Sequence, residues 1–316
     1  MKILIIRFSS IGDIVLTTPV IRCLKQQVKG IEIHYLSKKA FQQILSSNPH
    51  IDKLHLLDEQ LSVTIEQLKS ERFDYIIDLH NNLRTRIIKF QLGVKSRSFN
   101  KLNIKKFLLV NFKINTLPDK HIVDRYLETV AFLGVKNDGK GLEYFFSQDY
   151  NLELLLPSTH QHYLGLVIGA QHATKRLPPE KLIEICKAVN FPIVLLGGKE
   201  DAGRADEICK ASGEHVLNGC GKYSLDESAF LVKQAKKIIS HDTGLMHIAA
   251  AFNKPIVSVW GNTVPEFGMY PYMVSDHKIA EVKGLKCRPC SKIGYKKCPL
   301  GHFKCMNEQD INFIIG

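Results

Sequence analysis

Short apolar runs alternate with longer amphipathic stretches along nearly the whole chain. Runs that are rich in β-branched side chains and are followed by helical periodicity are typical of buried parallel strands. They lie at residues 3–8, 31–36, 53–57, 75–79, 164–168, 193–196, 237–240 and 256–260. These repeated strand–helix units predict an α/β protein with doubly wound parallel sheets.

The pattern also predicts where the chain divides. A helix with an apolar face beginning at Ile14 follows the first run, and Pro19 is expected to tighten or kink its early turns. Residues 147–161 are polar and predict no regular element. We therefore expect two domains, residues 1–155 and 156–316, with ligands bound at the carboxyl ends of their strands.

Composition is consistent with this division. A chain of 316 residues is long enough for two domains that each bury a core. No stretch approaches the ~18 uninterrupted apolar residues of a spanning helix, and the first apolar run is too short for a signal peptide and ends at Arg7. We expect a cytoplasmic protein, in which the 8 cysteines are reduced or bound to metal.

Basic residues cluster in two segments of this chain, whose net charge is +12. Residues 79–118 contain nine basic and no acidic side chains, and residues 282–307 contain seven more without an acid. Such clusters suit an anionic partner, which is a nucleic acid, an acidic membrane surface or a phosphorylated glycolipid, unless they are only solvated surface. Apolar residues interrupt the first cluster, so we expect folded structure there and not a basic tail.

The turn at residues 9–13 is the first candidate site. Ser10 and Gly12 are small enough for the backbone to approach a ligand, and the helix start offers N–H groups to an anion. Asp13 is open to two interpretations, a helix N-cap or a general base. The turn has the spacing of neither a P-loop nor Gly-x-Gly-x-x-Gly, which argues against a dinucleotide-dependent dehydrogenase.

Two further turns follow strands of the second half. Thr174 and Lys175 precede a helix that begins near Pro178, where a hydroxyl and an ammonium can meet a diphosphate, although two such residues also suit an ordinary surface. Glu200 and Asp201 follow two glycines after the next strand, where a carboxylate can accept both hydroxyls of a ribose or merely begin a helix.

The fourth candidate, at residues 240–250, is the most specific. The backbone N–H groups of Thr243, Gly244 and Leu245, with the Thr243 hydroxyl, can cap a phosphate at a helix start. His247 is about one turn into that helix. A single histidine in such a place is usually structural, but together with Asp242 the combination predicts a phosphate site.

Four cysteines near the C-terminus resemble a zinc-knuckle spacing. They are Cys287, Cys290, Cys298 and Cys305. A structural zinc ion, reduced thiols and a disulfide all remain open for this set.

Four motifs occur in the same order as in glycosyltransferase family 9, the heptosyltransferases that build the lipopolysaccharide inner core. The motifs are the Ser-Ser-Ile-Gly-Asp turn and residues 78–84, 175–180 and 242–247. The chain resembles this family over nearly its whole length. The resemblance implies a GT-B fold of two Rossmann-like domains facing a cleft. It also implies an ADP-heptose-like donor and an inverting reaction that requires no metal or other cofactor.

The resemblance also implies roles for individual residues. Asp13 is the expected base, and the acceptor is an anionic lipid-linked saccharide, which the enzyme reaches at the inner face of the inner membrane. Arg84 and Arg86 are expected to contact the acceptor. The residues expected to contact the donor are Ser10, Gly12, Thr174, Lys175, Glu200, Asp242, Thr243, Gly244, Leu245 and His247. Independently, the sequence contains no Asp-x-Asp, the usual carboxylate pair of metal–diphosphate sites.

Two departures from the family pattern bear on the donor pocket. Leu177 stands where tryptophan is common, and Gly261-Asn262-Thr263 replaces Gly-Pro-Thr. The composition also leaves two rival functions, a basic zinc-knuckle protein that binds nucleic acid and a nucleotide-sugar-binding protein without catalysis. A function in nucleic-acid binding does not explain why Asp13, Lys175 and Asp242-Thr243-Gly244 follow three separate strands.

Overall fold

The computed structural model describes residues 1–316, which form two compact units. The first unit contains Met1–Lys101 and Lys120–Ser147, and the second contains Leu102–Asp119 and Gln148–Gly316. The chain therefore leaves the first unit at residue 102, joins the second, and returns at residue 120. The sequence pattern does not predict this excursion.

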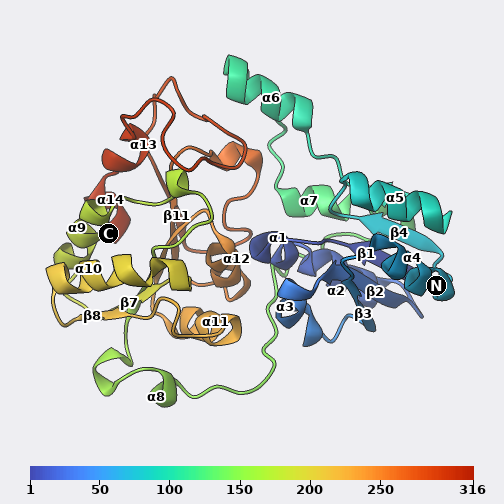
Figure 1. The fold of residues 1–316 in the computed structure, drawn as a ribbon, viewed down its shortest axis with the longest axis horizontal. Coiled ribbons are helices and arrows are strands. Elements are labelled where there is room, and N and C mark those ends of the chain that lie inside the picture. Colours follow the sequence, from blue (N-terminus) through green and yellow to red (C-terminus); the bar gives the residue numbers. More distant parts are fainter. The chain divides into compact units, whose positions relative to one another are not determined.

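The first unit is built on a five-stranded sheet whose order is β3-β2-β1-β4-β5, with every neighbouring pair parallel (Figure 1). Its strands are β1 (Lys2–Ile6), β2 (Glu32–Lys38), β3 (Lys53–Leu57), β4 (Tyr75–Asp78) and β5 (Ser96–Ser98). The first strand of the chain is thus the central strand, and Ile5 lies opposite Tyr35 on one side and Ile77 on the other.

Six α-helices accompany this sheet. They are α1 (Ile11–Val15), α2 (Thr18–Gln27), α3 (Gln42–Ser46), α4 (Leu61–Ser70), α5 (Leu83–Leu92) and α7 (Ile122–Leu127). The prediction of a single helix after the first strand is wrong, because α1 ends before Thr17 and Pro19 occupies the first turn of a separate α2. Proline is tolerated there because the N–H that it lacks has no partner within the helix.

The second unit contains a six-stranded sheet of order β11-β10-β9-β6-β7-β8, again parallel throughout. Its strands are β6 (Leu164–Val167), β7 (Ile193–Leu196), β8 (Val216–Asn218), β9 (Ile238–His241), β10 (Ile256–Trp260) and β11 (His277–Glu281). The two doubly wound parallel sheets confirm the predicted fold class.

Eight α-helices belong to the second unit. They are α6 (Asn103–Phe112), α8 (Leu152–Leu155), α9 (Pro179–Ala188), α10 (Ala202–Ser212), α11 (Leu225–Gln234), α12 (Gly244–Ala251), α13 (Lys304–Asn307) and α14 (Ile311–Ile315). Residues 147–161, where no element was expected, contain α8 and a short 3₁₀ turn. None of the helices combines the length and apolarity that crossing a bilayer requires.

The strand orders identify where ligands are expected to bind. Sheets of this kind bind ligands beyond the carboxyl ends of the two neighbouring strands whose connections run in opposite directions. In the first unit those strands are β1 and β4, and in the second they are β6 and β9. The turns after these four strands contain most of the candidate residues.

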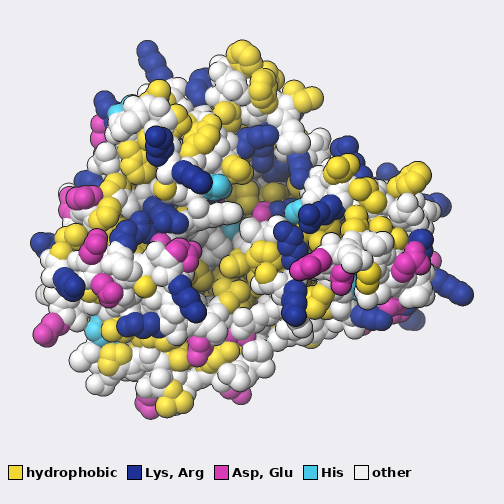
Figure 2. All heavy atoms as spheres, in the orientation of Figure 1, with side chains coloured by type: hydrophobic (Ala, Val, Ile, Leu, Met, Phe, Trp, Pro, Cys, Tyr) yellow, Lys and Arg dark blue, Asp and Glu magenta, His cyan; other side chains and the backbone are white.

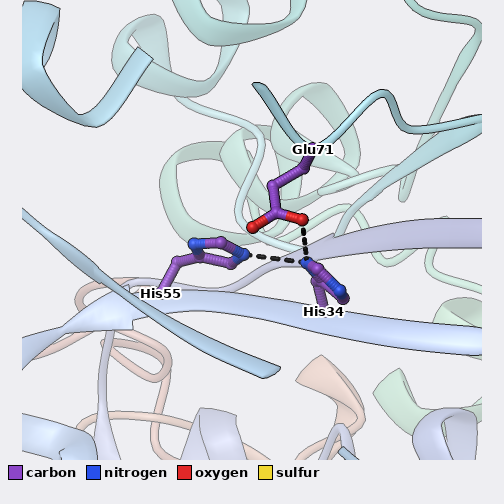
Figure 3. A group of neighbouring side chains, drawn as sticks. All are labelled: His34, His55 and Glu71. Atoms are coloured by element: carbon purple, nitrogen blue, oxygen red, sulfur yellow. Dashed lines mark hydrogen bonds and ion pairs between the residues drawn. The ribbon is translucent and has the colours of Figure 1, made fainter. Parts of the chain in front are cut away.

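A cluster near the amino ends of the first unit's strands lies away from those turns. His34 on β2, His55 on β3 and Glu71 directly after α4 point toward one another, with ligand atoms within 4.8 Å of each other (Figure 3). The His34 Nδ1 and His55 Nε2 atoms are 2.9 Å apart. Lys2 and Lys53 both form ion pairs with the Glu71 carboxylate. The cluster therefore ties β1, β2, β3 and the end of α4 together through hydrogen bonds and ion pairs.

Candidate active site

Asp13 lies just beyond the carboxyl end of β1, as the third residue of α1. Its Oδ2 atom forms an ion pair with Arg7 Nη2 at 2.7 Å and accepts hydrogen bonds from the Ser10 N–H and hydroxyl, at 3.2 and 2.9 Å. Ser10 occupies the N-cap position, so Asp13 is not the N-cap residue that one interpretation of the turn proposed. Asp13 instead completes the first turn by accepting the N-cap N–H.

The surroundings of Asp13 determine its charge. Burial by itself raises the pKa of this carboxyl, but Arg7 and the Ser10 hydrogen bonds outweigh burial, and the pKa is lowered from its usual value. The carboxylate is therefore ionised throughout the neutral range, and its side chain retains 20% exposure. An ionised and partly exposed carboxylate can accept a proton from a ligand hydroxyl.

The turn after β4 lies beside this carboxylate. Asp78 accepts hydrogen bonds from the N–H groups of His80 and Asn81, which fixes the turn, and Arg7 donates to the carbonyl oxygen of Leu79 at 2.6 Å. Burial, with a smaller effect of the Arg7 charge, lowers the pKa of His80 to about 4. The first unit therefore presents an ionised carboxylate, an arginine and a neutral imidazole at one end of β1 and β4.

Arg84 and Arg86 lie on α5, the helix that follows this turn, and both are exposed. Asn82 caps the helix by accepting a hydrogen bond from the Thr85 N–H at 3.0 Å. The cap fixes where α5 begins. Arg84 and Arg86 therefore both lie in the first turn of α5, next to the turn that follows β4.

In the second unit, the turns after β6 and β9 meet through an ion pair. Lys175 Nζ lies 2.5 Å from Asp242 Oδ2, and the Thr263 hydroxyl donates to the same oxygen at 3.2 Å. Two motifs that are 67 residues apart in sequence are thereby brought together at the neighbouring strands β6 and β9. An ammonium has three N–H donors, so Lys175 can bind Asp242 and still offer donors to an anion.

The start of α12 adds backbone donors next to Asp242. Thr243 is the N-cap residue, and no side chain caps the helix. The N–H groups of its first turn, including those of Gly244 and Leu245, thus have no partner within the helix, which suits an anion. His247 is buried one turn further on. His241, at the end of β9, accepts a hydrogen bond from the Leu177 N–H at 2.9 Å, and burial lowers its pKa to about 3.

The two acids after β7 differ in their surroundings. Asp201 is buried, accepts the Gly198 N–H at 3.1 Å and forms an ion pair with Arg204 at 3.2 Å. A Cβ on Gly169 would collide with the Asp201 carboxylate, so the chain needs glycine two residues after the end of β6. Glu200 is exposed. Asp201 therefore has a structural role, and Glu200 is the acid that a ligand can reach.

The C-terminal tail covers the turn that contains Lys175. Thr174 is buried, and its hydroxyl accepts a hydrogen bond from the Tyr295 N–H at 2.8 Å. This hydroxyl was expected to contact the donor, and in the structure it holds the tail. Asn262 is also buried, and neither polar atom of its side chain has a hydrogen-bond partner. A buried amide without partners costs free energy that a bound ligand can recover.

The four tail cysteines are free thiols in the structure. Cys305 is buried, and the other three are half-buried. The Cys290 thiol donates to the Cys287 carbonyl oxygen at 3.0 Å, and burial raises the pKa of Cys290 to about 11. Four thiols are a donor set that zinc binds, but no three of these sulfur atoms lie within 4.8 Å of one another, so the zinc site stays a prediction.

A cavity of about 370 Å³ lies between the tail and the 102–119 segment of the second unit. Arg288 lines it and donates to the carbonyl oxygens of Gly261 and Thr263, at 2.5 and 3.0 Å. Neither Lys175 nor Asp242 borders this cavity.

Sequence reasoning missed three contributors to these sites. Arg7, which only marked the end of a strand, holds Asp13, while Thr263 holds Asp242 and Arg288 holds the loop around Thr263. Thr263 and Arg288 act on residues more than 20 positions away, and the Arg7–Asp13 pair spans a strand end and a turn, so no local motif reveals these contacts.

The chain is similar to known proteins over most of its length. Residues 63–300 match the profile of the family described as Glycosyltransferase family 9 (heptosyltransferase). A lipopolysaccharide heptosyltransferase 1 from Campylobacter coli is 29% identical over 290 residues, which cover 83% of this chain and 84% of that protein.

Two solved structures show the same fold. The chain superposes on E. coli ADP-heptose lps heptosyltransferase II with a TM-score of 0.71 and 21% identity, covering 98% of both chains. The E. coli heptosyltransferase WaaC, solved with ADP-2-deoxy-2-fluoro heptose, gives a TM-score of 0.68 at 21% identity over 90% of this chain and 94% of that one. These matches confirm the expected GT-B class of two Rossmann-like units.

Proposed function

The chain belongs to glycosyltransferase family 9, and from that premise we propose that it moves a heptose, or a related sugar, from an ADP-linked donor to the lipopolysaccharide inner core. The matched heptosyltransferases support this choice of donor and acceptor. The reaction is an inverting transfer that requires no metal ion.

The observation that carries the proposal is the pairing of Lys175 with Asp242. It gathers an ammonium, a carboxylate and the uncapped start of α12 at the carboxyl ends of β6 and β9. In the bound state, Lys175 and the Thr243–Gly244 turn hold the diphosphate, and Asp242 or Glu200 accepts hydrogen bonds from the nucleoside. The unpartnered amide of Asn262 supplies a further polar contact to the donor.

The proposed chemistry is a single displacement at the anomeric carbon of the donor sugar. The acceptor hydroxyl attacks the anomeric carbon of the donor as its proton passes to the Asp13 carboxylate. The bond between that carbon and the diphosphate oxygen breaks on the opposite face, which inverts the anomeric centre. Nucleoside diphosphate leaves with the electron pair, and Lys175 with the α12 N–H groups stabilises its growing negative charge.

The acceptor side follows from the basic surface of the first unit. Arg84 and Arg86 contact the anionic, lipid-linked saccharide, and the enzyme works at the inner face of an anionic membrane. No nucleic acid takes part. A protein that only binds nucleotide sugars would use the same donor residues, but it would not need Asp13.

Binding of ADP to the Lys175→Ala variant tests the donor site. We expect calorimetry to show a loss of roughly 2 kcal/mol, about 30-fold in affinity, as for a lost charge-assisted hydrogen bond. Lys187→Ala, which removes an exposed lysine on α9, should bind ADP like the parent. Equal ADP affinity in the parent and in Lys175→Ala would contradict the proposed donor site.

Turnover in the presence of EDTA tests the absence of a metal requirement. We expect sugar transfer to lipopolysaccharide lacking its heptoses to continue at an unchanged rate, because Lys175 and backbone donors replace the divalent ion. Transfer that stops with EDTA and resumes with Mg²⁺ would contradict the metal-free mechanism.

A further inference from the structure

Helix α6 is an accessory of the second unit that is held through only one of its faces. Leu109 packs with Val264 and Phe267 in a small apolar cluster. Directly after the helix, the Lys113 ammonium donates to the carbonyl oxygens of Pro289 and Cys287, at 2.8 and 3.2 Å. These contacts fix α6 as a folded element of that unit.

The opposite face of α6 is also apolar, but it is exposed. Ile104 and Phe107, three residues apart, are 78% and 53% exposed. Phe112 is 61% exposed, and its ring meets that of Phe107 edge-on with centroids 6.0 Å apart. Ile114 continues the exposed surface beyond the helix, and Figure 2 shows hydrophobic side chains gathered over α6. A helix that is apolar on two faces requires cover on both.

The charges around α6 indicate what covers it. The helix lies within the 79–118 segment, which contains nine basic residues and no acid, and Lys105 is exposed beside Ile104. Cationic side chains next to aliphatic and aromatic ones match the boundary between anionic headgroups and acyl chains. Nucleic acid would attract the lysines and stack on the phenylalanines, but it offers nothing to Ile104 and Ile114.

We propose that α6 lies in the plane of an anionic membrane, with Ile104, Phe107, Phe112 and Ile114 inserted below the headgroups and Lys105 among them. The proposal rests on the proposed function in one respect, because a lipid-linked acceptor brings the enzyme to a membrane surface. Residues 102–119 attach the protein to the membrane, whereas Arg84 and Arg86 bind the acceptor.

Flotation with vesicles tests the insertion. The full chain should float with vesicles of 3:1 phosphatidylcholine and phosphatidylglycerol at 0.15 M salt. The Ile104→Ser/Phe107→Ser variant should bind them at least about 10-fold more weakly, because apolar area no longer enters the acyl region. Lys105→Glu should lower the affinity for these vesicles about 10-fold and leave the affinity for pure phosphatidylcholine vesicles unchanged.

A matched control separates insertion from general loss of surface apolarity. Leu154→Ser/Phe313→Ser also removes one exposed aliphatic and one exposed aromatic side chain, in α8 and α14, and it should float like the parent. A Phe107→Trp probe should shift its emission to the blue and be quenched by brominated lipids. The only native tryptophan, Trp260, is buried and gives a constant background.

Three results would overturn the proposal. The first is equal flotation of the parent and the Ile104→Ser/Phe107→Ser variant. The second is a parent that does not bind vesicles but self-associates, and that becomes monomeric with these two substitutions. The third is a parent that binds single-stranded RNA tightly at 0.15 M salt and does not float with vesicles. Transfer to a deacylated, water-soluble acceptor reports on the proposed function separately. Flotation without any transfer would retain the membrane helix and reject the transferase.

Discussion

Asp13 combines two properties that pull in different directions. Arg7 and the Ser10 donors keep it ionised, so it is ready to accept a proton, but the same contacts make it a weaker base. Its carboxylate also completes the first turn of α1. A purely structural role and a catalytic role therefore predict different consequences of losing only the charge.

The Asp13→Asn variant separates these roles. Asparagine retains an oxygen that can accept the Ser10 N–H, so we expect the folded protein to bind ADP like the parent. Turnover should fall by at least ~10², because the acceptor hydroxyl loses its proton acceptor. In the parent, the acidic limb of kcat/KM should lie below the usual range of an aspartate, since the pKa of Asp13 is lowered.

Asp52→Asn is the matched control for Asp13→Asn. Asp52 likewise accepts a backbone N–H, from Ile33 at 2.7 Å, and forms an ion pair with Lys25 at 2.6 Å, but it lies outside the turns after β1 and β4. Its variant should retain full turnover. A well-folded Asp13→Asn enzyme with parental turnover would remove Asp13 from the mechanism.

His55 predicts how the stability of the first unit depends on pH. Burial, with the charge of His34, lowers the pKa of His55 to about 4, while the unfolded chain has the ordinary value near 6.5. The stability that the neutral ring contributes is complete above pH ~6.5 and is lost as the pH falls toward 4. The expected loss is on the order of 2–3 kcal/mol.

Urea unfolding of His55→Gln between pH 7 and 4 checks this dependence. Glutamine can donate to His34 Nδ1 and does not titrate, so the variant should lose less stability over this range than the parent. His162→Gln, which changes an exposed histidine, should keep the parental slope. Parallel slopes for all three proteins would show that His55 does not control acid unfolding.

Among the helices, α5 carries the two arginines assigned to the acceptor. We expect Arg84→Gln/Arg86→Gln to raise the KM for the lipopolysaccharide acceptor about 10-fold or more and to leave ADP affinity unchanged, because two charge-assisted contacts to an anionic saccharide are lost. Steady-state kinetics with varied acceptor measures this effect. Lys29→Gln/Lys39→Gln removes the same charge from exposed sites and should keep the parental KM for the acceptor. A rise of this KM in the control variant as large as in Arg84→Gln/Arg86→Gln would indicate an effect of net charge.

The C-terminal tail has a separate test in its metal content. We expect about one zinc ion per chain by elemental analysis of protein purified without chelators, and none in Cys287→Ser/Cys290→Ser, because two of four thiolate ligands are gone. Cys209→Ser, in α10, should keep the zinc. A zinc-free parent whose four tail thiols all react with a thiol reagent would favour the reduced-thiol interpretation.

The elements that the sequence predicted are the ones with an uninterrupted apolar signal. The interior strands, such as β1 and β9, are buried along most of their length, so their hydrophobic runs identify them. Three edge strands were not predicted: β5 and β11 are short or polar and largely exposed, and β8 has only three residues. Helix α6 was hidden in the basic middle because its apolar residues do not form a single face.

Taken over the full chain, local motifs located the ends of β1, β6, β7 and β9, and the doubly wound order explains why these ends matter. Sequence could not show which acid after β7 is buried, because Asp201 and Glu200 are adjacent and only tertiary contacts distinguish them. It also could not show that residues 102–119 belong with the second unit, since their partners Val264 and Phe267 are about 150 positions away.

That excursion determines how the protein can be recombined. Exchanging whole units between relatives with a single crossover near residue 150 would pair the α6 of one parent with the Val264 and Phe267 surface of the other. Modular shuffling within the family should therefore succeed only when residues 102–119 travel with the C-terminal half. The segment that has to be exchanged as a whole is discontinuous in sequence, because it consists of residues 102–119 and 148–316. A single crossover point would separate these two parts.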